Sequence, residues 1–163
     1  MIQNGLKLVA LFLFASATLI AGSSYTVNTG SQAGTVTDNT TGLKWTRCPL
    51  LSSSLPDETS DCSGTPGGFI WADAITACEG LNYAESSTWR LPNVRELQSI
   101  VTNYRRYYPQ SNPEAFPVVG GDLWSSTTHK NGVSFAWMLY HPFGTIGWRN
   151  KNDSKLARCV TGP

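Results

Sequence analysis

The chain has 163 residues, which is enough for one domain with one hydrophobic core. Charged residues make up only 14% of it and the formal net charge is +1, so the composition gives no indication of a nucleic-acid partner. Six tryptophans, six tyrosines and fifteen glycines favour a loop-rich domain with aromatic packing over a helical bundle.

The first residues have the pattern of a secretory signal peptide. Lys7 precedes an apolar run over residues 8–22, and small residues follow it. The run is shorter than the ~20 apolar residues of a spanning helix, although an uncleaved anchor is the alternative. We therefore predict a signal peptide over 1–23 and a single domain over 24–163, with no membrane span after cleavage. Ser23 stands where a lipoprotein would carry its lipidated cysteine, so we expect no lipid anchor.

Export gives the four cysteines their meaning. An even number of cysteines in an oxidising compartment predicts disulfides, and no Cys-x-x-Cys spacing suggests zinc or redox chemistry. The expected location is the periplasm, the cell surface or the medium. Four cysteines allow three pairings, and spacing alone does not choose among them. They are Cys48, Cys62, Cys78 and Cys159.

The first half of the domain predicts strands, a loop and a helix. Alternation at 35–37 and 43–45 indicates two short strands joined by a turn at 38–42. Residues 49–68 are rich in Ser, Pro, Gly, Asp and Thr and predict a loop. A helix is expected over 69–84, with an apolar face. That face consists of Trp71, Ile75, Cys78 and Leu81.

A second helix is predicted to begin at Asn93. Asn93 is a favourable N-cap, and Glu96 three residues later completes a capping-box pattern. Pro92 disfavours helix before it, so residues 89–91 should be extended. We expect Trp89 in the core and Arg90 paired with a buried carboxylate or with loop carbonyls. The alternative makes Arg90 a bidentate donor to a ligand.

The second half predicts a long loop over 103–121 and then strands. Strands are expected at 123–128, 133–141, 144–150 and 155–160, which gives an α+β fold. Trp45, Trp71 and Trp137 are expected in the core. Trp124 begins a Trp-Ser-Ser-Thr run that reads as a strand edge with satisfied hydroxyls, or as a hydroxyl-lined site.

Several motifs together carry a family resemblance. In order along the chain they are "GTVTDNTTGLKW", "WADAITAC", "WRLPNVRELQSIV", "FP", "LWSST" and "ARCV". They span roughly residues 34–160, and they resemble the bacterial family of the Lcl C-terminal domain. That family is similar to the C-type lectin-like fold. The resemblance implies two helices packed on a small twisted antiparallel sheet, long loops, and termini brought close together.

The resemblance also implies a disulfide pattern. In lectin-like domains a cysteine on the first helix bonds one on the last strand, which corresponds to Cys78–Cys159 here. Cys48–Cys62 is then left to close the loop between them.

Calcium-dependent sugar binding is not expected. Calcium-dependent lectins use Glu-Pro-Asn or Gln-Pro-Asp together with Trp-Asn-Asp, and neither motif is present. The nearest string is Trp148-Arg149-Asn150, where arginine replaces the first ligand. Asp122, Asn152 and Asp153 offer oxygens, but turn chemistry explains them equally well. We expect no metal.

The candidate binding residues are cations interleaved with aromatic residues. Arginines take sulfate or carboxylate in bidentate fashion, and tyrosines stack on sugar faces. Family members are associated with sulfated glycosaminoglycans. The alternative is a solvated loop with snorkelling arginines. The candidates are Tyr104, Arg105, Arg106 and Tyr107, with Lys130, Arg149 and Lys151 on later turns.

The predicted function is binding or adhesion at the cell surface, through residues 104–121 and the turns that follow. The ligand would be a polysaccharide, such as a sulfated or anionic glycan, or a partner protein. A structural or assembly module is the alternative, and the resemblance implies a trimer as one oligomeric state. We expect no catalysis and no cofactor, because His129 and His141 form no triad motif. An enzyme of the formylglycine-generating type would need reactive cysteines.

Overall fold

The computed structural model describes residues 24–59, 61–101, 114–117, 120–140 and 143–163. Over these ranges the chain is α+β, with two α-helices and two small antiparallel sheets. The strands are β1 Tyr25–Val27, β2 Thr35–Asp38, β3 Lys44–Thr46, β4 Asp122–Thr128, β5 Phe135–Tyr140, β6 Thr145–Asn150 and β7 Val160–Thr161. The helices are α1 Trp71–Glu79 and α2 Val94–Ser99, with a short 3-10 turn at Gly30–Gln32.

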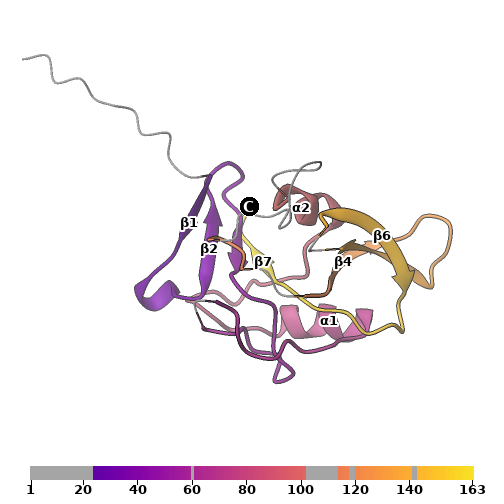
Figure 1. Ribbon diagram of the computed structural model, residues 1–163, viewed down its shortest axis with the longest axis horizontal. Helices are drawn as coiled ribbons and strands as arrows, with labels where there is room; N and C mark the ends of the chain where they lie inside the picture. The colour runs from indigo at the N-terminus through magenta and orange to yellow at the C-terminus, as the bar shows by residue number, and fades with distance from the viewer. Residues whose placement is uncertain (1–23, 60, 102–113, 118–119, 141–142) are drawn as a thin grey trace, which may run out of the picture.

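The first sheet joins the two ends of the described chain. Its strand order is β1-β2-β3-β7, so the opening strand and the closing strand belong to one sheet (Figure 1). Trp45 on β3 lies between Val36 and Val160 and is fully buried. The predicted turn at 38–42 is closed by Asp38, whose Oδ1 accepts the Thr40 N–H at 2.8 Å.

The second sheet has the strand order β4-β5-β6, and the two helices cover its opposite faces. Ala136 and Met138 point to the core that contains α1 residues. Leu139 on the other face points to the core that contains Leu97 of α2. Figure 1 shows α1 below the sheets and α2 beside β6. This alternation along β5 follows from the two-residue period of a strand.

The prediction of a strand over 155–160 is wrong for most of these residues. Lys155 bridges to Phe69, Leu156 bridges to Leu123, and regular pairing is confined to β7. Consecutive residues in this segment form hydrogen bonds with different neighbours: the Lys155 N–H donates to the Phe69 carbonyl, and the Leu156 N–H donates to the Asp122 carbonyl. The reason is that the segment crosses between the two sheets. The expectation of a single small sheet is also wrong, because the structure has two separate sheets and this segment joins them.

The capping box at Asn93 is confirmed. Its Oδ1 accepts the backbone N–H groups of Arg95 and Glu96, both at 2.9 Å, and the Glu96 carboxylate accepts the Asn93 N–H at 2.8 Å. The first helix is shorter than predicted. It ends at Glu79, because the chain turns at Gly80 and carries Leu81 into the core.

Arg90 forms an ion pair inside the domain. Its two terminal nitrogens donate to the two Glu96 oxygens at 2.7 and 2.8 Å. Burial by itself would raise the pKa of the Glu96 carboxyl, but the hydrogen bonds from Arg90 and from the Asn93 N–H hold it below its usual value. The carboxylate that caps α2 thus also fixes the extended segment before it, which bridges to Val160 through Arg90.

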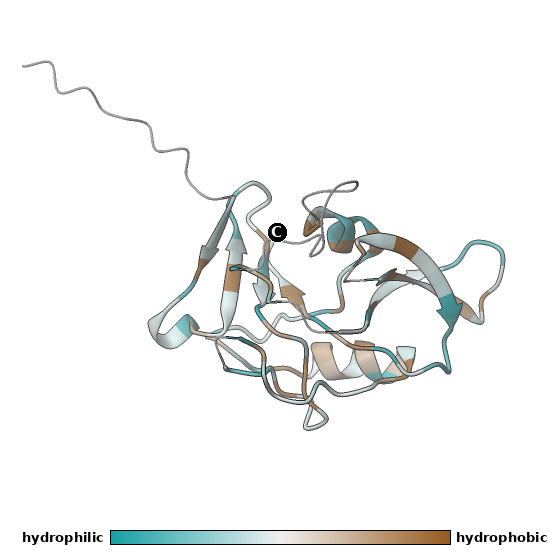
Figure 2. Cartoon of the chain, viewed as in Figure 1, coloured by the Kyte–Doolittle hydropathy of each residue, from teal (hydrophilic) through white to brown (hydrophobic). Residues whose placement is uncertain are grey.

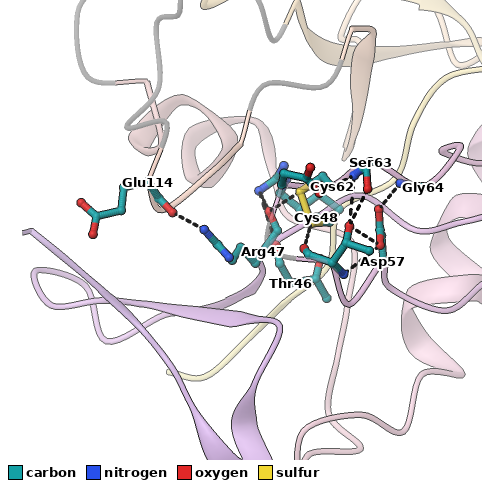
Figure 3. Close-up of a disulfide and its surroundings, with 11 residues drawn as sticks. Thr46, Arg47, Cys48, Asp57, Cys62, Ser63, Gly64 and Glu114 are labelled. Atoms are coloured by element: carbon teal, nitrogen blue, oxygen red, sulfur yellow. Dashed lines mark hydrogen bonds between the residues drawn. A yellow bond between two sulfur atoms is a disulfide. The ribbon is translucent and has the colours of Figure 1, made fainter.

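The structure pairs Cys78 with Cys159 and Cys48 with Cys62, as the resemblance implies. The first bridge ties α1 to the segment before β7. The second closes the 49–68 loop (Figure 3). Asp57 organises that loop, since its carboxylate accepts the backbone N–H groups of Thr59 at 2.9 Å and Gly64 at 2.7 Å.

The tryptophans divide into two groups. Trp45, Trp89 and Trp124 are buried, and the Trp124 indole N–H donates to the Phe69 carbonyl at 2.9 Å. Trp71 and Trp137 are half-buried, so the expectation that both are core residues holds only in part: Trp71 packs against the core that contains Ala74 and Cys78. Trp71 is the first residue of α1 and Trp137 lies on β5, and each keeps part of its ring in solvent.

Candidate functional site

Four of the seven predicted binding residues, Tyr104, Arg105, Arg106 and Tyr107, lie outside the described residues. Lys130 is exposed in the turn between β4 and β5, which Figure 2 shows as mostly hydrophilic. Arg149 is exposed on β6, with its guanidinium 5.3 Å from the centre of the Tyr140 ring.

Lys151 is engaged in contacts within the domain. Its ammonium lies 3.6 Å from the centre of the Trp71 ring and donates to the Thr128 hydroxyl at 2.9 Å. The Trp71 indole N–H in turn donates to the Ser125 carbonyl at 2.8 Å. Lys151 and Trp71 therefore fasten α1 to the end of the second sheet, and this arrangement leaves the lysine less available to a ligand.

The other face of this end of the sheet presents an aromatic surface that the sequence reasoning missed. Trp137 on β5 lies directly beside Trp148 on β6 in the strand register. Phe135 meets Trp148 edge-on at 5.1 Å between ring centres. The His129 ring lies 4.8 Å from Trp137 and 5.4 Å from Trp148. We call these four side chains, His129, Phe135, Trp137 and Trp148, the aromatic platform.

The aromatic platform is accessible to solvent. Trp148 is 48% exposed, and the other three side chains are half-buried. Aromatic residues in this position cost free energy unless something covers them, because apolar area in water is unfavourable. Their ring contacts with one another hold the indole planes in place before any ligand arrives.

A groove of about 320 Å³ adjoins the aromatic platform, between α2 and the second sheet. Trp137 and Ile146 form its sheet side, and Val94, Arg95 and Gln98 form its helix side. Arg95 and Gln98 are exposed residues on consecutive turns of α2. The groove thus joins an apolar wall to a guanidinium and an amide, which is the usual composition of a small-ligand site.

This arrangement suits a sugar ring. Indole faces are flat and apolar, and they match the C–H faces of a pyranose, while arginine and glutamine donate hydrogen bonds to its oxygens. Two signals in the sequence point to the surface. Phe135 and Trp137 are two apart on one strand, so they share a face. Trp148 is placed beside Trp137 by the antiparallel pairing of β5 with β6.

A metal centre has no support in the described ranges, where no three His, Cys, Asp or Glu side chains are grouped to hold an ion. Asp122 instead pairs with Lys155 at 3.0 Å.

All four cysteines lie in described segments, and none is a free thiol. None of the described helices combines the length and the apolar character that crossing a membrane requires.

The hydroxyls after Trp124 are used within the fold. Ser125 Oγ donates to the Trp137 carbonyl at 2.8 Å, and Thr127 Oγ1 accepts the Val94 N–H at 3.0 Å. The second of these bonds attaches the first turn of α2 to β4. The helix side of the groove is therefore fixed relative to its sheet side.

Comparison with known proteins identifies the family of the chain. No curated protein matches the chain. A model of the Lcl C-terminal domain family matches residues 34–161, which is well over half of the chain. That range includes both disulfides, both helices, the aromatic platform and the groove. The chain therefore belongs to the Lcl C-terminal domain family.

Proposed function

We propose that this chain is an exported binding domain that recognises a polysaccharide through the aromatic platform and its adjoining groove. The observation that carries the proposal is the set of partly exposed rings on one face of β5 and β6, beside the Arg95 guanidinium. Trp148 is 48% exposed and Phe135 and Trp137 are half-buried, so all three rings keep apolar surface in solvent. A stacked sugar would cover them.

We further propose that the fold is C-type lectin-like. Two features support this assignment. The opening and closing strands share one sheet, and a disulfide ties the first helix to the closing segment. Both are arrangements that the lectin-like fold implies.

Export to an oxidising compartment is part of the proposal. Both disulfides are buried, and disulfides of this kind persist where thiols are not kept reduced. The signal peptide that we predict over 1–23 lies outside the described residues. Placement in the periplasm, at the surface or in the medium follows from the same chemistry.

The charge beside the aromatic platform favours an acidic glycan. Arg95 lines the groove, and Lys130 follows His129 in the chain. Guanidinium groups bind sulfate and carboxylate in bidentate fashion. We propose that Arg105 and Arg106 extend this interaction, as the sequence predicts.

A glycan array tests the proposal, with the secreted protein applied in the presence and absence of a calcium chelator. We expect binding to acidic polysaccharides that the chelator does not change. Trp148→Ala should weaken binding at least tenfold, which corresponds to about 1.4 kcal/mol. Phe143→Ala is the matched control, because Phe143 is an exposed aromatic residue (66%) in the turn at the far end of the same hairpin.

The outcomes separate the alternatives. Binding that survives Trp148→Ala and disappears when Arg105 and Arg106 become alanine would transfer the site to the 104–121 segment. A protein that binds no glycan would overturn the proposal and favour the structural or assembly module.

A further inference from the structure

Arg158 is a charged side chain at the centre of the domain. It is 0% exposed and lies among the largest fully buried residues. Its Nη1 donates to the backbone carbonyls of Arg47 at 2.6 Å and Thr46 at 3.4 Å. Its guanidinium lies 5.0 Å from the centre of the Phe116 ring. The carbonyls and the ring fix the plane of the guanidinium.

One edge of this guanidinium has no acceptor. The buried Nε and Nη2 atoms of Arg158 form no hydrogen bond with any protein atom, and the buried Nε of Arg47 forms none either. Nε and Nη2 are the two nitrogens on one side of the planar fork. That side is the geometry that accepts a carboxylate or another oxyanion through two parallel hydrogen bonds.

The chain contains no carboxylate for this edge. All eleven acidic residues lie within the described segments, because residues 1–23, 60, 102–113, 118–119 and 141–142 contain no Asp or Glu. In the described segments the ion pairs are Arg90–Glu96 and Lys155–Asp122, and neither involves Arg47 or Arg158.

Glu114 is the acidic residue that contacts this pair most directly, and it does so through its backbone. Its carbonyl accepts a hydrogen bond from Arg47 Nη2 at 2.8 Å. Figure 3 shows the Glu114 carboxylate pointing away from Arg47. The segment that carries Glu114 therefore covers the arginine pair without neutralising it.

A buried cation without a counter-ion is unfavourable. Burial, and then repulsion from Arg47, lower the pKa of Arg158 to about 9, so the guanidinium still carries its charge at neutral pH. An apolar side chain of similar size would avoid this cost. The buried guanidinium of Arg158 would instead be stabilised by an anion, and the chain does not supply one.

We propose that Arg47 and Arg158 form an internal binding site for a small oxyanion, with the chemistry of a sulfate, phosphate or free carboxylate. Arg158 supplies the bidentate edge and Arg47 supplies one further N–H. Arg47 is half-buried, so the arginine pair lies close beneath the surface on that side. Because Arg158 is fully buried, a group attached to a polymer is too bulky to reach it. The site is therefore separate from the aromatic platform.

Side-chain NMR of arginine Nε–H groups tests the site. Sodium sulfate, sodium phosphate and sodium acetate are titrated into the secreted protein at constant ionic strength, with chloride as the balancing anion. We expect at least one of the three to shift the Arg158 Nε–H resonance saturably below about 50 mM. Arg47→Met should weaken the binding of that ion at least tenfold. The control Arg149→Met should leave the affinity for the ion unchanged.

Dextran sulfate at matched sulfate concentration separates this site from a surface glycan site. It should leave the Arg158 resonance in place, whatever it does to the aromatic platform. An Arg158 resonance that ignores all three small ions, or that moves only with dextran sulfate, would overturn the proposal. If Arg47→Met does not fold, the titration of the unaltered protein still decides the question.

Discussion

The bridge between Cys78 and Cys159 should contribute more to stability than any other single contact in the domain. It joins residues 81 positions apart, whereas Cys48–Cys62 joins residues 14 apart. The loop-closure relation gives about 4.5 kcal/mol for the longer bridge and about 3 kcal/mol for the shorter one at 25 °C. Domains of this size have a total stability of about 5–15 kcal/mol, so losing the longer bridge would remove a large part of it.

Two double variants make the comparison. One replaces Cys78 and Cys159 with alanine, and the other replaces Cys48 and Cys62. Each removes two buried sulfurs, so the packing losses are similar and the difference of about 1.5 kcal/mol reflects loop length. Urea unfolding followed by tryptophan fluorescence measures both free energies of unfolding. Trimethylamine oxide can be added if a variant is unfolded in buffer alone.

Equal losses in the two variants, or a larger loss from the shorter bridge, would refute this reasoning. Either result would mean that the 81-residue segment between α1 and β7 is already constrained in the unfolded chain, or that strain offsets the entropy.

Three further predictions concern local features. Asn93→Ala should lower the free energy of unfolding by about 1 kcal/mol, because it removes the acceptor for two N–H groups of α2, and chemical denaturation measures this. Glu96→Gln should cost about 1–3 kcal/mol at neutral pH. Because the folded pKa of Glu96 lies below its usual 4.5, that stability is present above pH 4.5 and is lost as the pH falls through the folded value, so the variant and the parent should converge in acid denaturation. Gly34→Ala should cost more than about 1 kcal/mol in thermal unfolding, because Gly34 has a φ of +76° and its new Cβ would collide with the Tyr83 hydroxyl. Gly30→Ala is its control, since Gly30 has a similar φ of +65° but open space around it, and equal losses would contradict the steric part of the explanation.

Local chemistry predicted part of this fold well. The start of α2 could be read from Asn93 and Glu96, because a capping box depends only on residues three apart. The same is true of the β2–β3 turn, where Asp38 bonds the backbone two residues on. These features need no knowledge of distant segments.

Features that depend on distant segments were harder to predict. Residues 155–160 look like a strand, yet each pairs with whichever neighbour the two sheets bring near. Trp137 looks like a core residue because its strand is apolar, but α2 covers only the part of that face near Leu139. The exposure of Trp137 depends on the length of α2, and the sequence of β5 carries no information about that length.

The buried Arg158 could not be recognised from the sequence either. An arginine beside a cysteine on an apolar segment gives no sign of its depth. That Arg158 has no carboxylate counter-ion becomes visible only when the positions of all eleven acidic side chains in the structure are known.

Isothermal titration of an acidic polysaccharide, chosen from the array, into the parent protein, Trp148→Ala and Phe143→Ala tests polysaccharide recognition most directly. We predict saturable binding to the parent, at least tenfold weaker binding to Trp148→Ala, and unchanged binding to Phe143→Ala. Equal affinity for the parent and Trp148→Ala would contradict the proposal that the aromatic platform binds the sugar.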